Sequence, residues 1–184
     1  MSAQHSFYFL RHGETQWNKD RLTQGQFDSQ LNATGRAQAL SAAEILKNKP
    51  IARIVASPLS RARHTAQAVA VKHDVEIIFD DGLMECHLGD RQGEPHGDWL
   101  KDYWLGKYAP PNGETFYEFS QRVWNAMQRA ILLGPETLIV AHGGLWLAAH
   151  EHVSIQPPLS PMPNATPLHI TQEDDTWYHT VLTE

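Results

Sequence analysis

The residues best suited to chemistry stand where short apolar segments end. Arg11 and His12 follow the apolar residues 7–10, and His142 follows the apolar residues 137–141. A neutral imidazole can attack through a ring nitrogen, and its ordinary pKa of about 6.5 leaves much of it neutral near pH 7. In an open α/β sheet, ligands bind at the carboxyl ends of the strands. These positions therefore predict a ligand site at one edge of a sheet.

A second arginine, Arg61, follows the apolar residues 54–56 and the pair Ser57-Pro58. A phosphoryl group carries several anionic oxygens that repel a nucleophile, so its site must offset that charge while holding the attack in line. A guanidinium suits this task because it offers a planar fork of donors and keeps its charge. Arg11 and Arg61 beside His12 therefore indicate phosphoryl-transfer chemistry.

Several neutral groups could complete a phosphate site. His142 could donate to the phosphoryl oxygens, and Gly143-Gly144 could expose backbone N–H groups at a helix start. Asn18 adds a neutral donor, and Gly13 allows the backbone to pass close to the phosphate. Taken singly, each has an ordinary structural explanation, such as a turn for the glycine pair. Their joint occurrence at strand ends favours the functional interpretation.

The elements that must position these groups alternate along the chain. Apolar runs at residues 7–10, 54–56, 75–79 and 137–141 predict buried strands. Between them, helical spacing begins near Thr34, then after Ser57 as an N-cap with Pro58 at the first helical position, and again over residues 115–133. Strand and helix in alternation predict an α/β fold: a single three-layer αβα domain over residues 1–184 with a mostly parallel sheet and helices on both faces. Residues 166–183 alternate apolar and polar side chains, which predicts an antiparallel hairpin closing the C-terminal sheet edge.

The segment 94–113 fits neither pattern and contains Trp99, Tyr103 and Trp104. One interpretation is a lid insertion over the site, since long irregular stretches in compact domains are often binding loops. The other is a short helix whose aromatic side chains pack on the core. If the three aromatics line the pocket, they would favour a substrate with a ring or an apolar body.

Several short motifs follow one another along the chain: Arg11-His12-Gly13-Glu14-Thr15, Gln24-Gly25 with Asp28 and Leu31, residues 34–39, residues 57–62, Leu83-Met84-Glu85 with Gly89 and Gly93, and residues 140–144. In this ordered set of motifs the chain resembles the histidine phosphatase superfamily, the phosphoglycerate mutase-like group.

The resemblance implies that His12 becomes phosphorylated and that Glu85 is the general acid and base. For that role Glu85 must be protonated when the substrate is bound. The implied catalytic residues are His12, Glu85, His142, Arg11 and Arg61, and the implied phosphate- or substrate-binding residues are Arg11, Gly13, Asn18, Gln24, Gly25, Arg61, His142 and Gly143.

Members of the resembled family include both phosphatases and mutases. A mutase must hold the phosphorylated intermediate away from water, and such relatives carry longer insertions that cover the substrate. Here only residues 94–113 are available for a cover. We therefore expect a phosphomonoester hydrolase acting on a small phosphorylated metabolite, with phosphoglycerate mutase-type transfer as the alternative. A non-catalytic phospholigand-binding module is a third possibility, disfavoured because the catalytic set is complete.

Composition narrows the partners. The net charge of −6 provides no basic stripe for nucleic acid, and no apolar run approaches the ~20 residues that span a bilayer. One cysteine, Cys86, excludes an intramolecular disulfide and a cysteine-based zinc site. We expect a cytoplasmic protein without metal or organic cofactor, because the arginines supply the charge that Mg²⁺ supplies elsewhere. His150 and His152 would point in different directions on a helix, so they do not suggest a metal site. The pattern assigns no role to His87.

Overall fold

The computed structural model describes residues 6–159 and 161–183, so residues 1–5, 160 and 184 of the predicted domain lie outside the description. Its centre is one seven-stranded sheet in the order β3-β2-β4-β1-β6-β7-β5. The strands are β1 Ser6–Arg11, β2 Arg53–Ala56, β3 Ile77–Phe79, β4 Thr137–Ala141, β5 Ser154–Gln156, β6 Pro167–Glu173 and β7 Thr176–Val181.

The strand pairing confirms the predicted mixed sheet. Strands β3, β2, β4 and β1 run parallel, whereas β6 pairs antiparallel with both β1 and β7. The hairpin β6–β7 is not the outermost element, because β5 pairs parallel with β7 beyond it. The short run 154–156 has too few residues for a periodic signal, so β5 was not predicted. Strand β3 begins two residues later than the apolar run 75–79 suggested.

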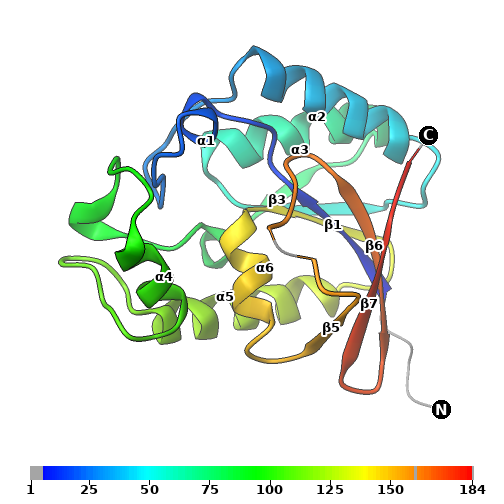
Figure 1. Ribbon diagram of the computed structural model, residues 1–184. Coiled ribbons are helices and arrows are strands. Elements are labelled where there is room, and N and C mark those ends of the chain that lie inside the picture. The colour runs from blue at the N-terminus through cyan, green and yellow to red at the C-terminus, as the bar shows by residue number, and fades with distance from the viewer. Residues whose placement is uncertain (1–5, 160, 184) are drawn as a thin grey trace.

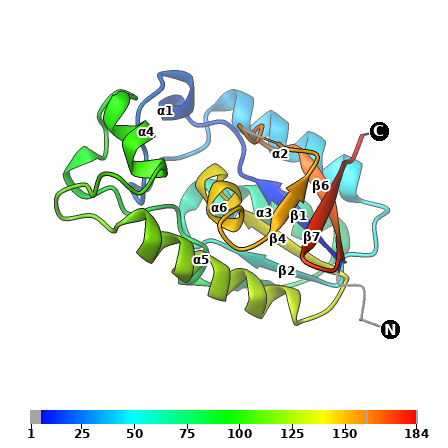
Figure 2. The ribbon, with the colours of Figure 1, turned by 60° about the horizontal axis from the view of Figure 1, so that its bottom comes forward.

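Helices cover both faces of the sheet, which confirms the three-layer prediction. The helices are α1 Gln16–Lys19, α2 Ala33–Leu46, α3 Ser60–His73, α4 Asp98–Trp104, α5 Phe116–Ile131 and α6 Gly143–Ala149, with 3₁₀ turns at Asp81–Leu83 and Gly89–Arg91. Helices α2 and α5 lie on opposite sides of the sheet in both views (Figures 1 and 2).

The alternation of side chains along β1 explains the two layers. Phe7 and Phe9 belong to the core that includes residues of α5 and α6, while Tyr8 and Leu10 pack with residues of α2 and α3. Successive side chains of a strand point to opposite faces, and a strand covered on both faces therefore reads as a continuous apolar run. No helix within residues 6–159 and 161–183 combines the length and apolarity needed to cross a bilayer.

Candidate active site

His12 lies directly after β1, at the carboxyl end of the parallel strands. Its backbone nitrogen donates to the carbonyl of Ala141, 2.9 Å away, which continues the pairing with β4. The ring Nδ1 is 2.7 Å from the carbonyl oxygen of Gly13. A carbonyl only accepts hydrogen bonds, so Nδ1 carries the hydrogen and Nε2 keeps its lone pair. The backbone thus selects the tautomer in which Nε2 carries a free lone pair.

Burial keeps the His12 ring neutral. The side chain is almost completely enclosed, and its desolvation lowers the pKa well below the usual value, with Arg61 and Arg11 lowering it further. The Gly13 hydrogen bond opposes this shift without reversing it. A neutral imidazole is the form that attacks, so the environment favours nucleophilic reactivity.

Two arginines, the buried Arg61 and the half-buried Arg11, bring positive charge to the same cavity. Arg61 donates to the carbonyls of Phe27 at 2.9 Å and Gly25 at 2.7 Å, and Arg11 donates to the carbonyl of Met162. Within the described ranges neither guanidinium forms an ion pair, and the Nε atom of each has no hydrogen-bond partner. Burial lowers the pKa of Arg61 to about 10. Buried cations without carboxylate partners are a strong attraction for an anion.

His142 is the N-cap residue of α6, and its ring lies against that of His12, with centroids 5.1 Å apart. Its Nε2 is 2.8 Å from Oγ of Ser57, while the buried Nδ1 has no partner in the described part of the chain. Burial, followed by the neighbouring Arg61, lowers the pKa of His142 well below its usual range.

The same contact corrects the prediction for Ser57. Helix α3 begins at Ser60 with Leu59 as its N-cap, so Ser57 does not cap it and Pro58 is not its first residue. Asp28 instead accepts hydrogen bonds at 2.7 Å from both the backbone nitrogen and the hydroxyl of Ser60. The Ser57 hydroxyl contacts His142 instead, and no local sequence pattern could indicate a contact between residues 85 positions apart.

Glu85 lies in the loop after the 3₁₀ turn Asp81–Leu83, and its carboxyl group lines the cavity. Its two oxygens accept hydrogen bonds from the backbone nitrogens of Cys86 and Gly144, each at 3.0 Å. A Cβ atom added to Gly144 would stand 2.1 Å from Oε1 of Glu85. The second glycine of the Gly143-Gly144 pair is therefore explained by the close approach of this carboxyl group.

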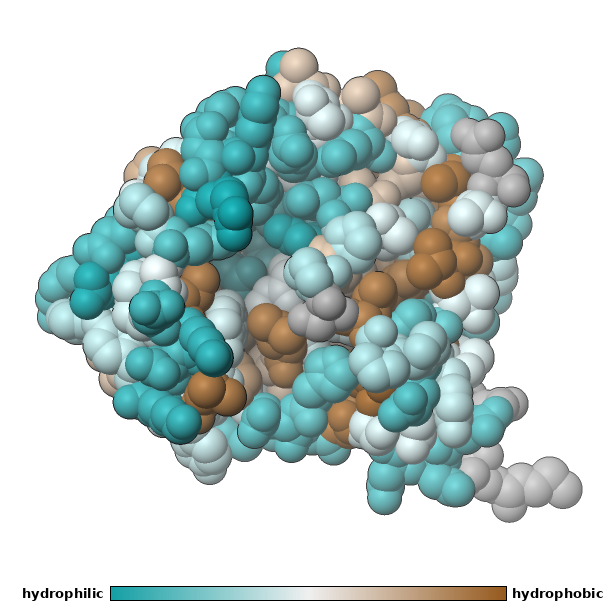
Figure 3. Space-filling view, viewed as in Figure 1, coloured by the Kyte–Doolittle hydropathy of each residue, from teal (hydrophilic) through white to brown (hydrophobic). Residues whose placement is uncertain are grey.

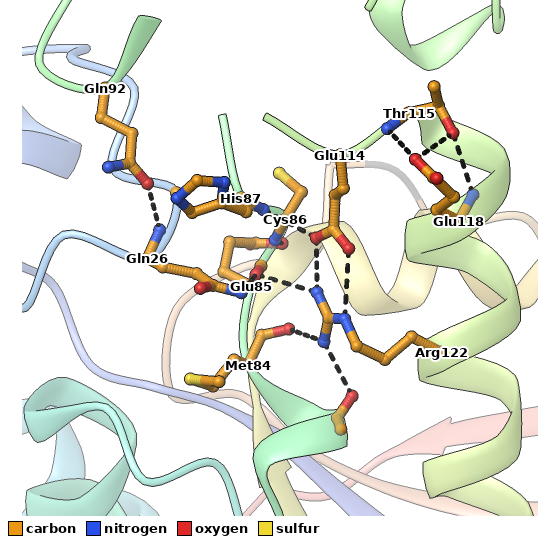
Figure 4. A network of polar contacts seen from close by, with 12 residues as sticks. Gln26, Met84, Glu85, Cys86, His87, Gln92, Glu114, Thr115, Glu118 and Arg122 are labelled. Atoms are coloured by element: carbon orange, nitrogen blue, oxygen red, sulfur yellow. Dashed lines mark hydrogen bonds and ion pairs between the residues drawn. The ribbon is translucent and has the colours of Figure 1, made fainter. Parts of the chain in front are cut away.

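Arg122 of α5 holds the Glu85 loop, and sequence reasoning did not find it. Its guanidinium donates to the carbonyls of Gly82 at 3.0 Å, Met84 at 2.9 Å and Glu85 at 3.2 Å. It also forms an ion pair with Glu114, and Figure 4 shows both side chains beside the loop. The helical spacing of α5 marked its apolar residues, whereas a polar residue that contacts backbone carbonyls carries no pattern.

The other predicted phosphate ligands divide into two groups. Asn18, Gln24, Gly25 and Gly143 line the cavity with the arginines and His12. Gly13 is not a lining residue: a Cβ there would stand 2.3 Å from the carbonyl oxygen of Gly35. That glycine is required by the contact between two backbone segments rather than by a phosphate.

Segment 94–113 contains the short helix α4, and its three aromatics have different surroundings. Tyr103 is fully buried in the core, and Trp99 packs beside Tyr108 and Arg91. Only Trp104 lines the cavity. The short-helix interpretation therefore holds for Tyr103, which packs in the core, whereas the condition that all three aromatics line the pocket is met only by Trp104, because helical spacing turns neighbouring side chains in different directions.

Asn164 is a further residue that sequence reasoning missed. Its Nδ2 donates to the backbone carbonyl of His12 at 2.9 Å, and thereby connects the loop between β5 and β6 to the end of β1.

The remaining histidines do not contribute to the cavity as a group. His87 does not line it, and His152 contacts Ser120 and stacks on Trp124. Within residues 6–159 and 161–183, no three His, Cys, Asp or Glu side chains are grouped as metal ligands.

Arg11, His12, Arg61 and Glu85 line one cavity of about 210 Å³, open to solvent on one side; His142 lies behind His12 and is not among the lining residues. Figure 3 shows a hollow on this side of the molecule, between the segment that carries α4 and helix α6. A neutral histidine, two arginines and a carboxyl group share it, which is an arrangement suited to phosphoryl transfer.

Comparison with known proteins agrees with this chemistry. Among curated relatives, the probable phosphoglycerate mutase GpmB of Escherichia coli O157:H7 is 38% identical over 147 residues, covering 74% of this chain and 68% of the relative. Among solved structures, a putative alpha-ribazole-5'-P phosphatase from Escherichia coli K-12 aligns with a TM-score of 0.82 and 26% identity, covering 99% of this chain and 97% of that one. A mycobacterial glucosyl-3-phosphoglycerate phosphatase aligns with a TM-score of 0.80 and 28% identity, covering 98% and 99%.

A family model matches residues 7–182, a span that contains every residue of the candidate active site. The chain belongs to the histidine phosphatase superfamily, branch 1.

Proposed function

We propose that the protein hydrolyses a small phosphorylated metabolite through a phosphohistidine at His12. The observation that carries the proposal is the Nδ1 hydrogen bond of His12 to Gly13, which leaves Nε2 free in a cavity with Arg11 and Arg61. A phosphomonoester with its phosphoryl group between the two guanidiniums would present phosphorus to this nitrogen.

In the first half-reaction, Nε2 of His12 attacks phosphorus and the bond from phosphorus to the ester oxygen breaks. Glu85, protonated in the substrate complex, gives its proton to the departing oxygen, so an alcohol leaves. Arg11 and Arg61 offset the charge on the transferring oxygens. His142, with Nε2 engaged by Ser57, donates from Nδ1 to the phosphoryl group.

In the second half-reaction, water attacks the phosphohistidine. Glu85 accepts a proton from the water, the phosphorus–nitrogen bond breaks, and its electron pair returns to Nε2 of His12. Inorganic phosphate leaves, and Glu85 is again protonated for the next cycle. The scheme calls for no metal ion, because the arginines provide the positive charge at the phosphoryl oxygens.

Hydrolysis is proposed over transfer because the cover of the site is small. It consists of α4 and its flanking turns, and the cavity remains open on one side, so water reaches the intermediate. Phosphoglycerate mutase activity is the competing proposal, because the E. coli relative is named a probable phosphoglycerate mutase.

A hydrolysis assay in a chelator on a panel of phosphomonoesters, including 3-phosphoglycerate, tests the proposal. We expect phosphate release from the wild type, loss of release in His12→Ala, and an acid-labile, alkali-stable label on His12 in Glu85→Gln. His87→Ala is the matched control, because it removes a nearby histidine that does not line the cavity. Isomerised phosphoglycerate without phosphate release would replace the hydrolase by a mutase. Activity in His12→Ala would refute the mechanism.

A further inference from the structure

The cavity has a polar part and an apolar part. The polar side chains that line it are Arg11, His12, Asn18, Thr23, Gln24, Arg61, Glu85 and His96. The apolar lining comes from the loop after α1, from α4, from α6 and from the loops at residues 86–88 and 161–162. We call six of its members, Leu22, Leu88, Leu100, Trp104, Leu147 and Met162, the apolar wall; Cys86, Trp146 and Pro161 also line the cavity.

Two helices give the apolar wall a fixed geometry. Leu100 and Trp104 are four residues apart on α4, which places them on one face of that helix. The Trp104 ring meets those of Tyr103 and Phe116 edge-on, with centroid distances of 5.0 and 5.8 Å. Leu147 stands one turn after Gly143 on α6, so this helix lines the polar part with its start and the apolar wall with its next turn. In Figure 3, hydrophobic side chains border the hollow on the sides of α4 and α6.

The charges of the cavity are already matched by one phosphate. Among the described residues that line it, the only arginines are Arg11 and Arg61, and there is no lysine. His96 also lines it, but burial lowers the pKa of this histidine, which favours its neutral form. The one acidic lining residue is Glu85. A phosphomonoester dianion thus meets two positive charges, and no cation is left for a second anionic group.

We propose that the apolar wall selects phosphomonoesters whose alcohol part is uncharged and largely apolar, and discriminates against substrates that carry a carboxylate. This inference rests on the proposed phosphomonoester hydrolysis and names its substrate class. A carboxylate on the alcohol part would lose its hydration against leucine and tryptophan side chains without gaining a partner, which costs free energy. Hydroxyl groups could instead be accommodated by His96, Thr23 and Gln24, which also line the cavity.

The proposed substrate class differs from phosphoglycerate, the substrate in the name of the E. coli relative. Phosphoglycerate is a small phosphomonoester with a carboxylate, and among the described lining residues no cation besides Arg11 and Arg61 is available to pair with that carboxylate. The proposal therefore predicts poor binding of 3-phosphoglycerate even though the phosphate ligands are complete.

A pair of compounds that differ by one carboxylate group tests the selectivity: phenyl phosphate and 4-carboxyphenyl phosphate. Binding to the non-turnover variant His12→Ala, measured by calorimetry, should be at least tenfold tighter for phenyl phosphate. In the wild type, kcat/KM should differ in the same direction by a similar factor. Leu100→Lys, which places a cation on the apolar wall, should bring the two compounds within about threefold of each other.

Leu105→Lys is the matched control, since Leu105 caps the same helix but is exposed and does not line the cavity. It should leave the preference unchanged. Equal binding of the two compounds, a preference for the carboxylated one, or no binding of either would overturn the inference. If His12→Ala prefers phenyl phosphate while the wild type hydrolyses neither compound, the substrate class stands and the hydrolytic function fails. If the wild type hydrolyses both equally well, the function stands and the substrate class fails.

Discussion

The backbone nitrogen of Gly144 lies 3.0 Å from Oε2 of Glu85, so the start of helix α6 positions the carboxyl group that shares the cavity with His12. This contact joins two segments that are 59 positions apart in the chain. It also leaves no room for a side chain at position 144, because a Cβ would stand 2.1 Å from the other carboxyl oxygen.

Gly144→Ala should therefore displace Glu85 without unfolding the protein. The clashing atoms are the far end of a flexible side chain, which can move at little cost in stability. Loss of general acid–base catalysis should lower kcat by about 10²- to 10⁴-fold, while thermal unfolding shifts by only a few degrees. Gly97→Ala is the control, since its added Cβ would meet only the Trp99 ring, at 3.2 Å. An unchanged kcat in Gly144→Ala would argue against Glu85 as the acid and base.

Acid should destabilise the fold through the two buried histidines. The pKa values of His12 and His142 are both lowered in the folded protein by burial, so the unfolded chain binds protons that the folded one does not. Their stabilising effect is complete above the unfolded pKa of about 6.5 and is lost as the pH falls below it, by up to ~2.7 kcal/mol per pH unit for two groups. Urea unfolding at pH 8, 7, 6 and 5 measures this loss.

The double variant His12→Asn/His142→Asn should reduce the pH dependence below pH 6.5. His64→Gln, a change at an exposed histidine of α3, should leave it as in the wild type. Parallel pH curves for the double variant and the wild type would show that other groups dominate the acid response.

Arg122→Lys should impair catalysis more than phosphate binding. Lysine keeps the charge but cannot contact three carbonyls and Glu114 at once, so the Glu85 loop should shift. A displacement of about 1 Å can cost about 10²-fold in rate, whereas the phosphate Kd should change less than about threefold because Arg11 and Arg61 are untouched. Steady-state kinetics and a phosphate titration separate the two effects.

Arg129→Lys provides the comparison for Arg122, since Arg129 is on the same helix and pairs with Asp80 at 2.8 Å, with the Arg129 side chain itself 59% exposed. Its kcat should stay within about twofold, because an exposed ion pair contributes only ~0–1 kcal/mol. Equal losses of kcat and of phosphate affinity in Arg122→Lys would mean that the whole site has collapsed.

Ser57→Ala should lower kcat/KM by leaving Nε2 of His142 unpaired. A buried unsatisfied group costs about 1–3 kcal/mol, and its ring would lose the contact that orients it toward His12. The matched variant is Ser120→Ala, because Ser120 is also buried and contacts a histidine, with its Oγ 3.1 Å from Nε2 of His152. Both variants should lose similar stability in thermal denaturation, and only Ser57→Ala should lose activity by about tenfold or more. Equal kinetics would assign Ser57 a purely structural role.

Much of the architecture was predictable because it depends on local patterns. The apolar run 137–141 coincides with β4, and the helix expected over residues 115–133 is α5, Phe116–Ile131. Strands buried on both faces give continuous apolar runs, and helices with one buried face give a helical apolar spacing, so both can be located in the sequence. The ordered motifs likewise predicted that Arg11, His12, Arg61 and Glu85 share one cavity, and all four line it.

The supporting contacts were not predictable, because each joins a side chain to a distant backbone or side-chain group. Arg122 contacts carbonyls in the Glu85 loop, Asn164 contacts the carbonyl of His12, and Ser57 contacts His142. Such contacts depend on where the sheet order brings the loops, and they leave no periodicity. The apolar wall was predictable only in part for the same reason. Trp104 belongs to a group of aromatic residues that suggested a pocket, whereas no sequence pattern distinguishes Leu22 and Leu147 from leucines of the core.

The position of β1 in the sheet has a consequence for synthesis of the chain on the ribosome. Strand β1 pairs only with β4 and β6, and β4 begins about 125 residues after β1 ends. At about 5–20 residues per second, the segment Phe7-Tyr8-Phe9-Leu10 would wait roughly 6–25 s for its first partner strand. During that time an apolar strand is translated but unpaired, which makes it a natural binding site for a chaperone. His12, the proposed nucleophile, is thus translated long before β4, whose Ala141 carbonyl accepts the hydrogen bond from its backbone nitrogen.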